Sequence, residues 1–204
     1  VELMPFSSGL KRNIVQCLDD YNIPLLLNHT VVDIHGKDRV TGVTIAEVDR
    51  QTKKPIPGTE QYIECDTLLL SVGLIPENEL SVGAGVSLAR STQGPVVDET
   101  YQTNVEGIFA AGNVLHVHDL VDFVSEEAAR AGEAAAKFVK GSIAKKSDGV
   151  PVEEGFGVNG IVPQIIHPEL LTEPVKFMFR PRDVYKGARI CVDIDGEEVL
   201  RGKP

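Results

Sequence analysis

The sequence predicts an α/β protein that contains an antiparallel β-meander and ends in a small β-rich module. Residues 66–73 are almost continuously apolar, as is typical of a strand covered on both faces. Residues 123–140 are rich in alanine and read as one long helix. On either side of this pair, short β segments alternate with turn-forming residues. The 204 residues allow one large domain or two small ones, at roughly 100 to 200 residues per domain.

The first part of the chain, residues 1–65, combines a short helix with β segments. Leu10, Ile14 and Leu18 recur at helical spacing, and Ser7 and Ser8 ahead of them can cap the first amides. The compact apolar run 23–27 predicts a buried strand. Three further strands are marked by Val31, Val32 and Ile34, by Val43, Ile45 and Val48, and by Tyr62 and Ile63. Their short connections favour an antiparallel meander.

The second part, residues 66–140, begins with the apolar strand, which Gly73 and Pro76 end. Two short strands are expected at 95–98 and 107–111. The helix 123–140 carries small residues, which let it lie close to a sheet, and Asp122 is a favourable N-cap for it.

The end of the chain differs in composition. Residues 141–151 are polar and read as a linker. From residue 152 onward we expect a separate β-rich module, with strands within 175–180 and 189–195. Asp195-Gly196 before the segment 197–200 is a strong signal for a two-residue hairpin.

Composition excludes several classes of protein. The chain has 20 Lys and Arg against 30 Asp and Glu, a net charge of −10, without a local basic patch, so we expect neither nucleic acid nor an anionic membrane as a partner. The apolar stretch 68–76 is far shorter than the roughly 20 residues of a membrane helix, and a cytoplasmic protein is expected. Cys17, Cys65 and Cys191 form no C-x-x-C pair, so a thiol redox centre is not indicated.

The segment 103–114 is the part of the sequence that most clearly indicates a binding site. It reads as a short strand that ends in Ala-Gly-Asn, where Gly112 lets a ligand approach and Asn113 can present its side-chain oxygen to a hydroxyl group. The free amides of the following helix can stabilise an anionic group at its start. This pattern predicts the edge of a nucleotide-cofactor site.

His116 and His118, with Asp119 and Asp122, are of the residue types that ligate metals. Zinc sites need three or four converging ligands, and a second cluster is not evident. We therefore predict no metal site, and expect these histidines to lie on a loop over the cofactor.

Three pieces in order, residues 66–73 with Pro76, residues 103–113, and the helix after Asp122, resemble the FAD-dependent pyridine nucleotide oxidoreductases with two dinucleotide domains. This family includes the disulfide reductases and thioredoxin reductase. The resemblance covers about the first 140 residues and implies partial FAD/NAD(P)-binding Rossmann-like domains. Residues 1–65 then resemble the tail of the NAD(P)H domain with its meander, and 66–140 the C-terminal part of the FAD domain.

The same resemblance implies FAD and NAD(P)H as cofactors. The segment from Gly107 to Val114 is similar to the one that binds the ribityl chain and pyrophosphate, and the following helix to the one that points at the flavin ring. The cofactor-binding residues carried over are Gly73, Gly112, Asn113, Val114, Asp122 and Phe123. Catalytic residues cannot be assigned in this way.

Two departures from the family pattern matter. The usual motif ends in Ala-Gly-Asp, whereas Asn113 removes one negative charge; with the histidines that follow, it resembles the branch of amino-acid and opine dehydrogenase FAD subunits and partners of glycerol-3-phosphate dehydrogenase. The two strand–glycine loop–helix units of the family are also missing. The only textual match, residues 155–160, follows acidic residues and runs into Pro163, and we reject it.

The sequence therefore predicts a C-terminal fragment of a flavin-dependent, NAD(P)-linked oxidoreductase that moves hydride between FAD and a small substrate or NAD(P)H. Alone it is expected to be inactive. The alternative is a non-catalytic docking or assembly module of a multi-subunit dehydrogenase. Expected partners are a small-molecule substrate and either a second copy of the chain or another dehydrogenase subunit.

Overall fold

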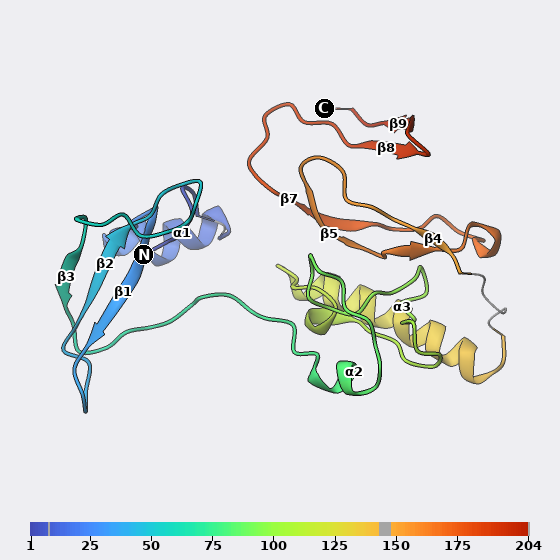
Figure 1. Cartoon of the computed structure of the whole chain (residues 1–204), viewed down its shortest axis with the longest axis horizontal. Helices are drawn as coiled ribbons and strands as arrows, with labels where there is room; N and C mark the ends of the chain where they lie inside the picture. Colours follow the sequence, from blue (N-terminus) through green and yellow to red (C-terminus); the bar gives the residue numbers. More distant parts are fainter. Residues whose placement is uncertain (8, 143–147, 204) are drawn as a thin grey trace. The chain divides into compact units, whose positions relative to one another are not determined.

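The computed structural model describes residues 1–7, 9–142 and 148–203. The chain divides into two units, Val1–Val72 and Gly73–Pro204, which are described in turn (Figure 1). The fold is mixed α/β with antiparallel strands, as the sequence predicts. The domain boundaries expected at 65/66 and 151/152 stay predictions, and residues 143–147 of the expected linker lie outside the described residues.

A three-stranded antiparallel sheet organises the first unit. Strands β1 (His29–His35), β2 (Gly42–Glu47) and β3 (Gln61–Glu64) pair in the order β1-β2-β3, which confirms the meander. β2 lies in the middle, where Ile45 is fully buried and Val43 nearly so. Gly36 makes the β1–β2 turn at φ +108°, and a Cβ there would overlap the carbonyl of Arg39. Only glycine suits that turn.

The helix expected near the N-terminus is α1 (Lys11–Cys17), followed by a 3₁₀ turn, Asp19–Tyr21. Leu10 is its N-cap and makes no side-chain capping bond; Ser8, one of the expected caps, lies outside the described residues. The predicted strand 23–27 is wrong, since it is reduced to one parallel bridge between Glu2 and Leu27. Among the described residues, no other strand pairs with this run, so its side chains stay largely exposed.

The buried strand predicted at 66–73 is also wrong. These residues have no regular secondary structure, and Leu69 and Val72 are each 88% exposed. An apolar strand is buried only when neighbouring strands pair with both of its edges and other layers cover its faces. None of the described residues forms such a sheet around this segment.

The second unit is built on the helix α3 (Val121–Val139), close to the predicted 123–140. Its other elements are α2 (Glu79–Gly83), the 3₁₀ turns η2 (Gly112–Val114) and η3 (Pro168–Leu170), and the strands β4 (Val150–Pro151), β5 (Val158–Val162), β6 (Ile165–Ile166), β7 (Met178–Pro181), β8 (Cys191–Ile194) and β9 (Glu197–Arg201). The strands pair antiparallel as β4-β6, β5-β7 and β8-β9. The strands expected at 95–98 and 107–111 form only isolated bridges, because each meets its partner at a single pair of residues.

The core of this unit joins segments far apart in sequence. It consists of Val97, Tyr101, Ala110, Leu115, Ala131 and Val162. The Gln164 side chain accepts the Val97 N–H at 2.9 Å, and the buried His167 ring lies 3.0 Å from a Glu99 carboxylate oxygen. The segment after β5 is thereby held against residues 97–99.

The chain ends in the hairpin that the sequence predicts. β8 and β9 are joined by Asp195 and Gly196, with φ of 52° and 83°. Two consecutive positive φ values are typical of a type I′ turn, which matches the twist of the strands. Every residue of both strands is exposed.

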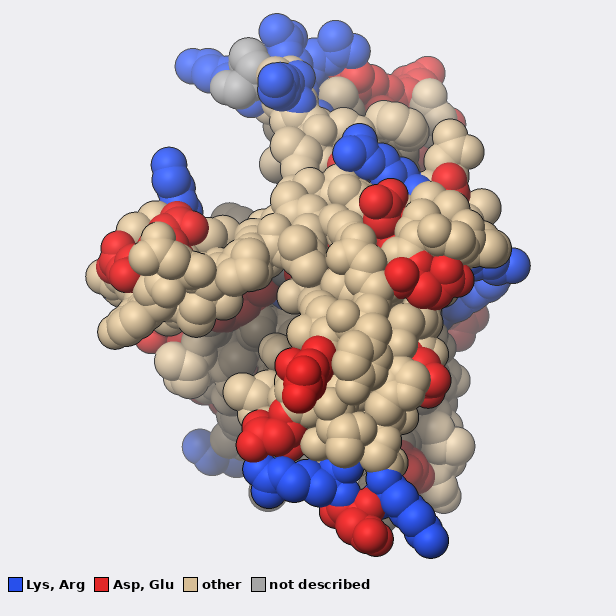
Figure 2. All heavy atoms as spheres, turned by 90° about the vertical axis from the view of Figure 1, so that its left-hand side faces the viewer, with Lys and Arg blue, Asp and Glu red and all other residues tan. Residues whose placement is uncertain are grey.

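Charged side chains are dispersed over the surface. On the face shown in Figure 2, acidic and basic side chains are interspersed with uncharged residues, and neither sign covers the face. Among the described residues, no helix is long and apolar enough to cross a membrane.

Candidate functional site

The predicted cofactor edge folds as an extended residue followed by a tight turn. Ala111 is extended, and Gly112 turns the chain at φ +75° into η2. This φ suits glycine rather than a residue with a Cβ. Gly112 is buried, and its N–H donates to Oε1 of Glu127 at 2.6 Å. The Gly112 amide is therefore committed to α3.

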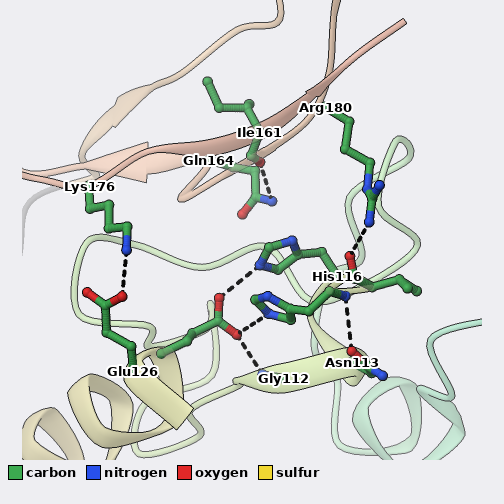
Figure 3. Close-up of polar contacts among 11 residues, drawn as sticks. Gly112, Asn113, His116, Glu126, Ile161, Gln164, Lys176 and Arg180 are labelled. Carbon is green, nitrogen blue, oxygen red and sulfur yellow. Dashed lines mark hydrogen bonds and ion pairs between the residues drawn. The ribbon is translucent and has the colours of Figure 1, made fainter. Parts of the chain in front are cut away.

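Glu127 is the centre of a polar cluster. It is 2% exposed and belongs to the inner face of α3 with Ala131 and Ala134. His116 Nε2 lies 2.8 Å from Glu127 Oε2, and His118 Nε2 lies 3.1 Å from Oε1. In Figure 3 the dashed lines from His116 and Gly112 end on this carboxylate. Burial alone would raise the pKa of Glu127, but the bonds from His116, Gly112 and His118 outweigh it and lower that pKa below its ordinary value.

Asn113 and Val114 lie on the outer side of the same turn and are exposed. The Asn113 side-chain oxygen accepts the His118 N–H at 3.1 Å, which ties the histidine loop to η2 (Figure 3). The Val114 carbonyl accepts a bond from the buried Asn78 side chain at 2.8 Å. The turn is thus anchored from two sides, and a second lone pair of the Asn113 oxygen is available to a ligand.

The start of α3 differs from the prediction. Its N-cap is Leu120, which makes no side-chain bond, so Asp122 is not the cap. Val121 and Asp122 already belong to the helix. Asp122 therefore lies in the first turn, where its negative charge interacts favourably with the helix dipole. The adjacent Phe123 is 45% exposed, and the Lys176 ammonium lies 5.5 Å from its ring centroid.

A cavity of about 550 Å³ opens beside the cluster. Residues of several segments line it: Leu74, Ile75 and Pro76; Ser91, Thr92 and Gln93; His116 to Asp119; Phe123 of α3; Asn159 and Gly160 of β5; and Lys176 to Arg180, which includes residues of β7. Lys176 pairs with Glu126 at 2.6 Å, and Arg180 pairs with Asp119 at 3.0 Å while donating to the Val117 carbonyl. The cavity therefore combines apolar walls with two cations at its rim.

The structure brings Gly112, Asn113 and Val114 together at the foot of α3. Gly73 precedes Leu74, which lines the cavity, and has φ +101° with open space where its Cβ would be. Sequence reasoning missed Glu127, although it recurs with Ala131 and Ala134 at helical spacing. Lys176 and Arg180 were also missed, because no local pattern links them to a loop some sixty residues earlier.

Comparison with known proteins identifies the class of this α/β protein as that of the FAD-linked oxidoreductases. Residues 2–136 match the family model of the pyridine nucleotide-disulphide oxidoreductases, and the chain belongs to this family. Its members are, in general, FAD- and NAD(P)H-dependent flavoproteins.

Several curated proteins are similar to this chain. It is 38% identical over 113 residues to a mitochondrial dihydrolipoyl dehydrogenase of Caenorhabditis elegans, a match over 55% of this chain and 21% of that protein. It is 24% identical over 143 residues to the small chain of a glutamate synthase [NADPH] of Halomonas elongata, over 64% and 30% of the two chains. A Lactococcus lactis thioredoxin reductase structure aligns with a TM-score of 0.45 and 23% identity, over 57% of this chain and 36% of that one. The chain thus spans less than a third of the length of the two curated relatives.

In η2, Asn113 presents an exposed side-chain oxygen that can accept a hydrogen bond from a hydroxyl group, and at the start of α3 Phe123 presents an exposed apolar ring. Both groups are chemically compatible with one edge of a flavin. A pyrophosphate needs a glycine-rich turn between a strand and a helix. No such unit occurs in the described parts of either unit, and the rejected segment 155–160 leads into strand β5 instead of a helix.

Proposed function

We propose that this chain supplies the flavin-side part of a FAD-dependent, NAD(P)-linked oxidoreductase that moves hydride between FAD and a small substrate or NAD(P)H. The observation that carries the proposal is the exposed Asn113 at the Gly112 turn, within the region that matches the family. FAD, when bound, supplies the hydride-accepting ring.

The chain's own residues have three tasks in this proposal. Asn113 accepts a hydrogen bond from a ribityl hydroxyl, while its bond to the His118 amide keeps the side chain oriented. The first turn of α3 presents free N–H groups towards the ring. Lys176 and Arg180, held by Glu126 and Asp119, place positive charge at the cavity where an anionic substrate group can bind.

Replacing Asn113 tests this placement. In the whole gene product, Asn113→Leu is expected to weaken flavin binding by about 1 to 3 kcal/mol, since it removes a polar contact without replacing it. Flavin released on dilution, followed by fluorescence, measures the change. Asn113→Asp, which restores the usual family residue, is the matched control and should retain flavin. Equal flavin affinity in the wild type and Asn113→Leu contradicts the placement.

The 204-residue chain alone is expected to bind neither FAD nor NAD(P)H tightly and to show no turnover, because its described residues offer no pyrophosphate loop. Absorbance spectra of the purified chain and NADH oxidation by it measure this. Stoichiometric flavin in the isolated chain would falsify the fragment interpretation.

A docking role is the second candidate, and the exposed apolar segment favours it. Leu69, Leu70, Val72 and Ile75 are between 67% and 88% exposed. Large apolar side chains that are exposed in this way often meet another chain or layer. If assembly is the only role, the whole gene product remains free of flavin while it still forms a complex with a dehydrogenase subunit.

A further inference from the structure

We propose that His116, His118 and Glu127 bind one divalent transition-metal ion, with Zn²⁺ as the best match. The site departs from the sequence prediction of no metal, because the third ligand comes from α3 and not from the histidine loop. The inference does not depend on flavin binding.

The geometry already approaches that of a metal site. One ligand atom from each of the three residues lies within 4.8 Å of the other two. His116 Nε2 lies 2.8 Å from Oε2 of Glu127 and His118 Nε2 lies 3.1 Å from Oε1, so each imidazole faces its own oxygen of the carboxylate. Tetrahedral zinc with bonds of about 2.0 to 2.2 Å places its ligand atoms roughly 3.3 Å apart. Both nitrogen–oxygen distances are within about 0.5 Å of that spacing, and side-chain adjustment within the 4.8 Å cluster would bring the two imidazoles and the carboxylate around one ion.

The charges also suit a cation. Glu127 is almost fully buried, and an ionised buried carboxylate needs positive charge or several N–H donors close to it. Two imidazole rings, 4.1 Å apart between centroids, face it and carry borderline donors that zinc prefers. The Gly112 N–H donates to Oε1 of the same carboxylate and fixes its orientation, as hydrogen bonds of outer-shell residues do in metal sites.

An open coordination position is available. The His116 side chain is 14% exposed, and both histidines line the 550 Å³ cavity. Among the described residues, the cluster holds three protein ligands. Three ligands and one position open to a cavity are the arrangement of catalytic zinc sites, in which water or a substrate oxygen takes the fourth place.

The competing interpretation is a cluster held by hydrogen bonds alone, with three N–H groups donating to Glu127. The molecule contains a natural comparison in His167 and Glu99, a buried pair with one imidazole and one carboxylate. In that pair, the carboxylate and the imidazole are each other's hydrogen-bond partners, and among the described residues no second histidine joins them. Metal binding should distinguish the two clusters, because the first offers three ligands whereas the His167–Glu99 pair offers only two.

The test uses the tag-free chain, stripped with a chelator and titrated with Zn²⁺ in competition with a chromophoric chelator, and separately with Co²⁺. We expect one equivalent of either ion per chain and the visible bands of tetrahedral Co²⁺. His118→Ala and Glu127→Gln each remove a ligand and should weaken Zn²⁺ binding by at least the roughly 10 to 100-fold that loss of an outer-shell partner costs. His167→Gln, at the comparison pair, should bind as the wild type does.

Circular dichroism shows whether each variant is folded. His116→Gln, at the ligand nearest solvent, is an additional variant if Glu127→Gln is unfolded. X-ray absorption of the zinc-loaded wild type needs no variant, and it should show two imidazole ligands. Absence of Zn²⁺ uptake by the wild type, uptake without imidazole ligands, or equal affinity in folded ligand variants overturns the proposal.

Discussion

At the scale of single residues, Glu127 is the most consequential side chain of the second unit. Its buried carboxylate accepts the Gly112 N–H and lies within hydrogen-bonding distance of both histidine rings, so replacing it removes the anion that all three groups contact. Its pKa lies below the ordinary value despite burial. The ionised form therefore stabilises the folded chain.

Glu127→Gln is expected to lower the free energy of unfolding by about 1 to 3 kcal/mol at pH 7. Because the folded-state pKa is lowered, this contribution is present above the ordinary carboxyl pKa and is lost as the pH falls through the lowered value. Urea unfolding of both proteins at pH 7 and at successively lower pH measures it. Glu126→Gln, at the exposed neighbour, should change the unfolding midpoint little. A difference that does not shrink in acid contradicts the charge argument.

Some residues of this site can be identified from the sequence alone, and others cannot. Gly112 and Asn113 stand out in the sequence because they belong to one continuous motif, and their role in cofactor binding stays a prediction. The sequence predicts Asp122 as the cap because it precedes the helix pattern, but α3 begins earlier, at Val121. Glu127 could be found only by asking which helix face is buried, and its histidine partners lie on a loop whose conformation no periodicity specifies.

At the scale of elements, the chain offers two glycines for which the same substitution has opposite expected effects. Gly196 lies in the hairpin turn at φ +83°, whereas Gly132 lies inside α3 with open space around it. Alanine at positive φ costs roughly 1 kcal/mol or more. In a helix interior it gains roughly 0.5 to 1 kcal/mol over glycine.

Gly196→Ala should therefore reduce the population of the β8–β9 hairpin, and Gly132→Ala should raise the unfolding midpoint of the second unit. Cross-strand nuclear Overhauser effects measure the first change and thermal unfolding the second. An unchanged hairpin in Gly196→Ala contradicts the type I′ turn.

Elements that depend on local sequence were predicted well. The meander and the hairpin were correct, because adjacent segments pair through short turns. The strand predicted at 66–73 was wrong for the opposite reason. A buried apolar strand needs strands paired on both of its edges, and the described residues form none beside this segment. An apolar run thus indicates that a segment would be stable as a buried strand, but not whether neighbouring strands are present to bury it.

At the scale of the whole molecule, the junction between the two units is expected to be the site most open to proteolysis. Residues 66–76 lack regular structure and expose large apolar side chains, which thermolysin prefers. Brief digestion should give one fragment of about the first 70 residues and one of the remainder, as mass spectrometry would show. The composition of residues 141–151 favours a cut there instead, and a first cleavage in that stretch would contradict the expectation from exposure.

The pairs Val97–Gln164 and Glu99–His167 have a consequence for how fast the chain reaches its native state. They close loops of 67 and 68 residues, whereas β1 and β2 meet across a short turn. Loop-closure entropy rises with length, and rates fall as contacts become less local. The meander should therefore form early and the second unit later, giving two refolding phases after dilution from urea. Stopped-flow mixing would resolve them, and Gln164→Ala should slow the later phase if that contact is formed at its rate-limiting step, while the earlier phase keeps its rate.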